Sequence, residues 1–89
     1  MTEIRTLKLK NKLGMHARAA ANFVKVAQQF NAGIYIEHNG QIADGRSILD
    51  ILTLACPHGG MLTIKAEGAD ASKAIEELEK LVENKFGET

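Results

Sequence analysis

This chain has few cysteine and aromatic residues and no net charge. Cys56 is the one cysteine among 89 residues, which excludes an internal disulfide framework and leaves stability to packing. Eleven basic residues balance eleven acidic ones, so no overall field attracts nucleic acid or an anionic membrane. No apolar run approaches the roughly 18 residues that indicate a membrane-spanning helix, so we expect no membrane insertion.

The sequence also gives no indication of a targeting or linker segment. Residues 1–5 lack the basic start and apolar stretch of a signal peptide, and no internal repeat or low-complexity tract comes after them. A chain of this length supports one small core. We therefore expect a soluble, cytoplasmic protein with a single domain covering residues 1–89.

Apolar residues recur with spacings that predict four strands and at least two helices. The alternating spacing of strands occurs at 4–9, 33–37, 41–44 and 61–67, and the spacing of helices at 17–30 and from position 70 or 72 to 82. Asn39-Gly40 is a strong hairpin signal between two of the strands. The run 48–56 fits either a buried strand or a short helix, and Ser47 followed by Asp50 resembles a capping box, which favours the helix.

The resulting order is βαββαβα. In a chain this short it predicts an α+β fold, a two-layer sandwich with a mostly antiparallel sheet and the helices on one face. The other face is expected to be partly solvated, because Lys8, Lys10 and Lys65 lie on the strands.

The stretch 14–20, Gly-Met-His-Ala-Arg-Ala-Ala, carries the chemistry of the chain. It puts His16 at the predicted start of a helix, where free N–H groups and the helix dipole favour an anion. An imidazole in that place can act as a nucleophile toward a phosphoryl group, and Arg18 offers a planar, permanently charged fork for phosphate oxygens. The stretch therefore predicts a phosphorylatable histidine.

The chain resembles the HPr family, the histidine-containing phosphocarrier proteins of the phosphoenolpyruvate-dependent phosphotransferase system and their nitrogen-related paralogues. The resemblance covers nearly the whole length and rests on four motifs: Gly14-Met15-His16-Ala17-Arg18, Asn39-Gly40, Arg46-Ser47-Ile48 and Gly68-Ala69-Asp70. It implies an open-faced β-sandwich, with three helices over a four-stranded antiparallel sheet. It does not decide between a sugar-uptake and a nitrogen-type member.

The resemblance also implies roles for individual residues and partners. His16 would take a phosphoryl group on Nδ1 from Enzyme I and pass it to an Enzyme II A-type domain, without a cofactor or metal. Arg18 would attend the phosphate, together with the backbone N–H groups of Ala17 and Arg18. Such a protein is a monomeric carrier, a substrate of phosphotransferases rather than an enzyme itself. Ala19 stands where the family usually has proline, which bears on the tuning of the site.

Two further expectations concern the segment after the hairpin. Ser47 matches the serine that an HPr kinase/phosphorylase modifies in many members, although its simplest role is a helix N-cap worth about 1 kcal/mol. A phosphate there would meet Asp50 one turn on, which disfavours the modification. Ile48, Leu49 and Leu52 match the region through which the family docks its partners, and we expect at least one of them to be exposed.

Three other functions are disfavoured by the residues. RNA binding is disfavoured by the neutral charge and the lack of paired aromatic residues on a strand. An enzyme with His16 as a base would need a relay partner, and no serine, cysteine or carboxylate lies near it in sequence, which leaves only a neighbour brought to it by the fold. Cys56 and His58 provide only two neighbouring ligands, whereas structural zinc takes four.

Overall fold

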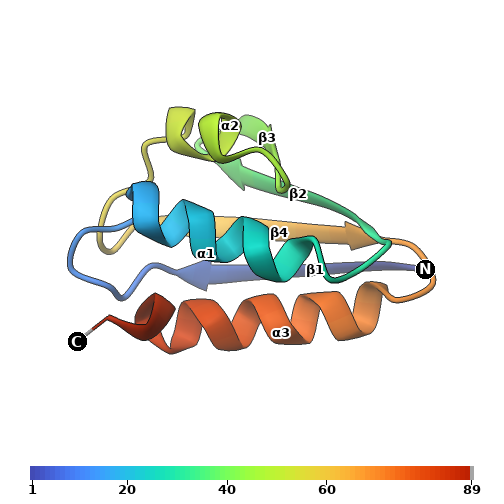
Figure 1. The fold of residues 1–89 in the computed structure, drawn as a ribbon. Coiled ribbons are helices and arrows are strands. Elements are labelled where there is room, and N and C mark those ends of the chain that lie inside the picture. The colour runs from blue at the N-terminus through green and yellow to red at the C-terminus, as the bar shows by residue number, and fades with distance from the viewer. Residues whose placement is uncertain (89) are drawn as a thin grey trace.

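Strands and helices succeed one another in the order that the sequence predicts. The structure is a computed structural model that describes residues 1–88. Its elements are β1 (Thr2–Lys8), α1 (Ala17–Ala27), β2 (Gly33–His38), β3 (Gln41–Asp44), α2 (Ile48–Thr53), β4 (Met61–Glu67) and α3 (Ala71–Glu83), and a 3₁₀ turn at Lys85–Gly87 comes after α3. Figure 1 shows this arrangement, and it confirms the α+β, βαββαβα fold.

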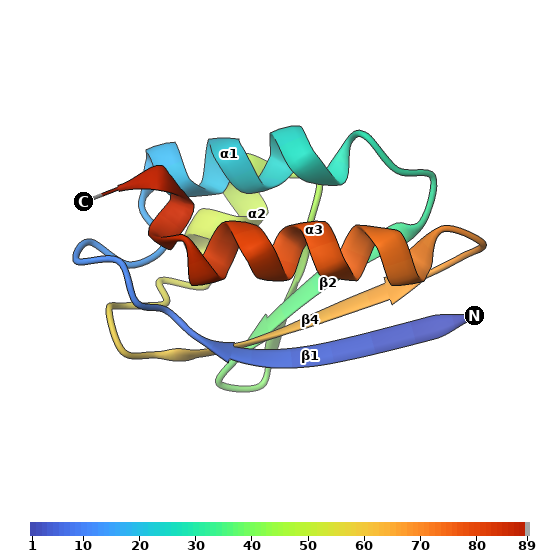
Figure 2. The same ribbon diagram turned by 90° about the horizontal axis from the view of Figure 1, so that it is seen from below.

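The four strands form one antiparallel sheet in the order β1-β4-β2-β3. In the register, Glu67 of β4 lies opposite Thr2 on one side and Gly33 on the other. All three helices lie on one face of this sheet, and Figure 2 shows the layer of helices and the layer of strands edge-on. The fold is therefore an open-faced, two-layer sandwich.

The core lies between the sheet and the helices because apolar residues face inward with the period of each element. In β4, Leu62 and Ile64 are fully buried, and they share the core with Phe23 of α1 and Leu78 of α3. The opposite face of the sheet remains open to solvent and carries exposed side chains from three strands: Ile4, Tyr35 and Ile42. Within residues 1–88, no helix has both the length and the apolar character needed to cross a membrane.

The ambiguous run after the hairpin is a helix, and Ser47 explains its start. The Ser47 hydroxyl accepts a hydrogen bond from the Asp50 backbone N–H at 3.2 Å, which satisfies a free donor of α2. The second half of the capping box is absent, because the Asp50 carboxylate accepts from the N–H of Asp44 at 3.4 Å instead. The helix ends at Thr53, three residues before the predicted limit.

The predicted limits of two further elements were wrong by a few residues. The first helix ends at Ala27 rather than at Phe30, because the chain turns there and Asp70 holds the segment after the turn. The Asp70 carboxylate accepts from the N–H groups of Asn31 and Ala32, each at 2.8 Å. The first strand runs Thr2–Lys8 rather than 4–9. Leu9 lies beyond its end but remains fully buried.

Candidate functional site

His16 is the N-cap residue of α1, as the sequence predicts. Its backbone is extended, its side chain makes no capping hydrogen bond, and no acidic residue lies in the first turn of the helix. The first intrahelical bond runs from the N–H of Ala20 to the carbonyl of His16 at 2.9 Å. The N–H groups of Ala17, Arg18 and Ala19 precede it and have no partner inside the helix, so they are available to an anion beside the imidazole.

The loop before α1 is fixed by the chain that comes after α2. The N–H of Met15 donates to the carbonyl of Cys56 at 2.9 Å, and Gly14 has a positive φ of 65°. A Cβ atom on Gly14 would lie 2.7 Å from the Cys56 carbonyl oxygen and 2.8 Å from the His58 nitrogen. Only glycine fits this approach, which sets the direction in which the chain enters the helix at His16.

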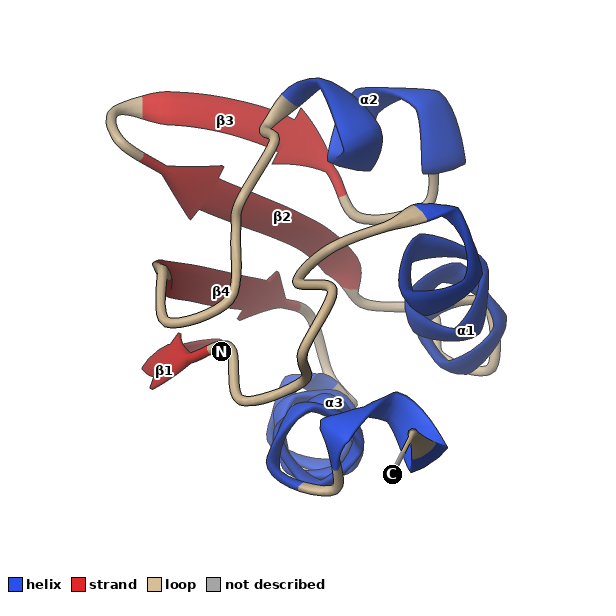
Figure 3. Ribbon diagram, turned by 90° about the vertical axis from the view of Figure 1, so that its left-hand side faces the viewer, coloured by secondary structure: helices blue, strands red, loops and turns tan. Residues whose placement is uncertain are grey.

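The C-terminal segment lies at the same end of the molecule as the start of α1, a placement visible in Figures 2 and 3. The Glu88 carboxylate is hydrogen-bonded to Nε2 of His16, and its other oxygen accepts from the side-chain amide of Asn11 at 3.1 Å. Nδ1 of His16 makes no hydrogen bond with any of residues 1–88. The sequence did not predict Glu88 or Asn11 as site residues. The one available signal was Phe86, which continues the apolar spacing of Leu78 and Val82 beyond the expected end of α3.

The neighbours of Glu88 determine the pKa of its carboxyl group. Partial burial acts to raise the pKa of the Glu88 carboxyl, but hydrogen bonds from Asn11 and His16, and the positive charges of His16 and Arg18, outweigh it and leave that pKa lowered. Arg18 is exposed and makes no ion pair with the residues that the structure describes. A shallow hollow of about 470 Å³ lies here, lined by Lys12, Leu13, Arg18, Phe86, Gly87 and Glu88.

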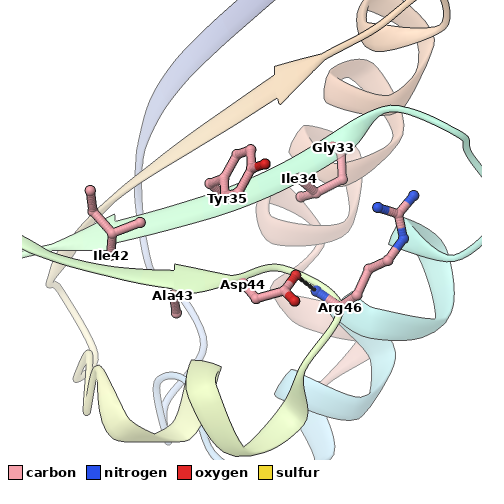
Figure 4. Close-up of a pocket in the computed structure, with 7 residues that line it drawn as sticks. All are labelled: Gly33, Ile34, Tyr35, Ile42, Ala43, Asp44 and Arg46. Carbon is pink, nitrogen blue, oxygen red and sulfur yellow. Dashed lines mark hydrogen bonds between the residues drawn. The ribbon is translucent and has the colours of Figure 1, made fainter.

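Ser47 lies apart from His16, near the opposite end of α1. The neighbouring Arg46 guanidinium donates to the carbonyls of Ala27, the last residue of that helix, and of Phe30 beyond it. Figure 4 shows Arg46 and Asp44 at the rim of a second hollow, where the Arg46 N–H donates to the Asp44 carboxylate at 2.9 Å. The two guanidinium bonds tie the end of α1 and the residues after it to the chain that follows β3. Ser47 is partly exposed.

The three predicted docking residues differ in how far their side chains are exposed to solvent. Leu49 is 76% exposed and Ile48 39% exposed, whereas Leu52 is half-buried against the core. Two of the three are therefore exposed, as expected, and their use in docking stays a prediction. The sequence reasoning did not include Leu13, which is 69% exposed in the loop that carries His16.

Cys56 belongs to the core rather than to a ligand set. It is buried, and burial raises the pKa of its thiol, which disfavours the thiolate that a metal requires. The neighbouring His58 is exposed. In the described part of the chain, no three His, Cys, Asp or Glu side chains are grouped so that they could hold a metal ion.

Comparisons with known proteins agree with this geometry. The family described as the PTS HPr component phosphorylation site matches residues 4–84. The Phosphocarrier protein HPr of Neisseria meningitidis serogroup A is 34% identical over 83 residues, which is 93% of each chain. A crystal structure of HPr-C-His from Thermoanaerobacter tengcongensis superposes with a TM-score of 0.94 at 39% identity and covers 98% of both chains. An HPr dimer from the same organism gives a TM-score of 0.78 at 40% identity over 92% of this chain and 94% of that chain.

We predict that Gly14→Ala lowers the free energy of unfolding by about 2 kcal/mol or more, because it adds a clash to an unfavourable φ. Gly59→Ala is the matched control: its φ is 82°, but a Cβ there meets nothing within 4 Å. Urea denaturation of both variants measures the difference. Equal destabilisation of the two would show that the close approach to Cys56 and His58 does not constrain the loop.

We also predict an acid-dependent contribution from Glu88. Because its pKa is lowered in the folded protein, the stabilisation is fully present above the unfolded value of about 4.3 and is lost as the pH falls through the folded one. The unfolding free energies of the wild type and Glu88→Gln should therefore converge as the pH falls below the unfolded value and through the lower folded one. Glu83→Gln, an exposed carboxylate paired with Lys10, serves as the control. A difference that does not shrink in acid would contradict the contact.

Proposed function

The chain belongs to the HPr family of phosphotransferase-system components, and we propose that it is a phosphocarrier in which His16 accepts a phosphoryl group and passes it on. The observation that carries the proposal is the place of His16 at the N-terminus of α1, which has no side-chain cap and no acid in its first turn. The free N–H groups of Ala17 and Arg18 would receive phosphate oxygens, and Arg18 would add a mobile positive charge. By analogy with phosphorylated hydroxyl residues, the added charge is about −1.5 to −2.

The transfer requires a free lone pair on one ring nitrogen of His16. In the proposed step, this nitrogen attacks the phosphorus of a phosphorylated donor, and the bond from phosphorus to the donor breaks with its electron pair returning to the donor. The group later leaves His16 by the same displacement toward an acceptor. No cofactor takes part, and the protein is a substrate of the two partners rather than an enzyme.

The partial exposure of the site fits a carrier. Main-chain N–H groups and the exposed Arg18 would hold the phosphoryl group without enclosing it. A deep, fully ligated pocket would bind the product more strongly and slow its delivery. The site therefore supports reversible transfer between proteins.

We assign the donor to Enzyme I and the acceptor to an Enzyme II A-type domain, the partners that the family resemblance implies. The exposed apolar side chains of Ile48 and Leu49, with the half-buried Leu52, would form the docking surface. The helix that carries them leads into Cys56, which is hydrogen-bonded to the loop before His16. A partner on α2 would therefore lie close to the imidazole. The proposal treats the protein as a cytoplasmic monomer.

Ser47 is the second residue that we propose to be phosphorylated, in this case by an HPr kinase/phosphorylase. Its hydroxyl is partly exposed and already caps α2, where the helix dipole favours a phosphate. The Asp50 carboxylate in the first turn opposes the same charge. We therefore expect Ser47 to be a poorer substrate than a family member with a neutral residue at this position.

The test is the intact mass of the protein after incubation with phosphoenolpyruvate, magnesium and Enzyme I from the same organism. We predict one added, acid-labile phosphoryl group on the wild type and none on His16→Ala. Ser47→Ala is the control and should be labelled like the wild type. An unlabelled wild type, or a labelled His16→Ala, would contradict the proposal. Light scattering of the same sample measures the oligomeric state.

A further inference from the structure

We propose that Glu88 is a positioning residue of the phosphoryl acceptor: its carboxylate holds the imidazole proton of His16 on Nε2 and so leaves the lone pair on Nδ1 for the phosphoryl group. The inference rests on the proposed function of His16 and adds a residue from the far end of the chain. It is carried by the hydrogen bond between the Glu88 carboxylate and Nε2, and by the way the fold places that carboxylate.

The C-terminal segment is built to place Glu88 at the imidazole. Phe86 is only 4% exposed, and its carbonyl accepts from the Asn22 side chain of α1 at 3.5 Å. The backbone reaches this position through positive φ values of 56° at Lys85 and Phe86. The Glu88 N–H then donates to the Lys85 carbonyl at 2.9 Å, which closes the turn. Burial of Phe86 thus fixes the direction of Glu88.

Asn11 orients the carboxylate from the other side. Its side chain is 1% exposed, and its amide nitrogen donates both to Glu88 at 3.1 Å and to the Gly14 carbonyl at 2.6 Å. Its amide oxygen is buried without a partner among the described residues. If the Asn11 amide were turned by 180°, its oxygen would face the Glu88 carboxylate and the Gly14 carbonyl, which are both acceptors. The observed orientation is therefore the one in which both of these oxygens receive a hydrogen bond. The buried Asn11 amide therefore connects the loop before His16 to the Glu88 carboxylate.

An ionised carboxylate only accepts hydrogen bonds, so the ring nitrogen that faces it must be the donor. The neutral imidazole has one N–H; when that proton is on Nε2, the lone pair is on Nδ1. The lowered pKa of Glu88 supports the ionised form at neutral pH. Carboxylates fix the tautomer of metal-binding and catalytic histidines in the same way.

The carboxylate also balances the charge that the reaction creates. Nδ1 forms a bond to phosphorus, the bond from phosphorus to the donor breaks, and the donor keeps that electron pair. The ring retains its proton on Nε2 and becomes a cation, which faces the negative charge of Glu88. When the group leaves toward an acceptor, the ring returns to its neutral form with the proton still on Nε2.

The experiment uses phosphoramidate, a small donor that needs no Enzyme I, so its outcome does not depend on the partner assignment. Wild type, Glu88→Ala and the control Glu83→Gln are phosphorylated with it, and long-range ¹H–¹⁵N spectra identify the nitrogen that carries the group. The ¹⁵N shifts of the unphosphorylated ring in alkaline solution report the tautomer directly. Glu88→Gln removes the charge but keeps an oxygen that can accept from Nε2.

We expect the wild type and Glu83→Gln to keep the proton on Nε2 and to form only the Nδ1 product. Glu88→Ala should show a mixed tautomer, some Nε2 product and roughly 10-fold slower labelling, the lower end of the loss found when a metal-binding histidine loses the group that orients it. Glu88→Gln should be slowed but should keep the Nδ1 product. Wild-type ring shifts, product and rate in Glu88→Ala would overturn the proposal, even if Enzyme I labels His16.

Discussion

The contact between the loop before α1 and the chain that comes after α2 is the constraint on which the site depends. Leu9 makes two of the bonds in this contact: its carbonyl accepts from the Gly59 N–H at 2.8 Å, and its own N–H donates to the Gly60 carbonyl at 2.9 Å. Further along the loop, the Met15 N–H donates to the Cys56 carbonyl. These backbone bonds extend the pairing of β1 and β4 beyond the end of the strands. They hold the start of α1 at one end of the sheet, and the close approach of Gly14 completes the contact.

The helix start and the C-terminal segment give His16 two different environments. On the helix side there are N–H groups, suited to an anion; on the other side there is the carboxylate of Glu88. His16 thus lies between free backbone N–H groups at the helix start and a carboxylate bonded to its Nε2. This asymmetry distinguishes the two ring nitrogens, which a histidine on an open surface would not achieve.

Local patterns in the sequence were sufficient for the order of the elements and for the candidate residues at the start of α1. The spacing of apolar side chains predicted the order of strands and helices, and Ser47 with Asp50 identified α2 as a helix. His16 and Arg18 were found because both belong to one short motif. The start of α1 at Ala17 was predicted correctly, but its end was missed, because that end depends on Asp70, which is far away in the chain.

The rest of the site depends on contacts between distant segments. Glu88 lies 72 residues after His16, and the apolar spacing that ends at Phe86 shows only that the C-terminal segment packs on the core, not that Glu88 meets His16. Asn11 reads as an ordinary loop residue, and only the fold shows that it is buried between the two segments. Of the exposed apolar residues near the site, Leu13 was missed because it lies in a loop without periodicity.

The central claim is that the N-terminus of α1 receives the phosphoryl group on His16. The most direct measurement compares ¹H–¹⁵N amide spectra of the protein before and after phosphorylation by Enzyme I and phosphoenolpyruvate. The account predicts the largest shifts at the amides of Ala17 and Arg18, because these N–H groups gain an anionic acceptor. Unchanged amides there, with the largest shifts at Ser47 and along α2, would contradict it.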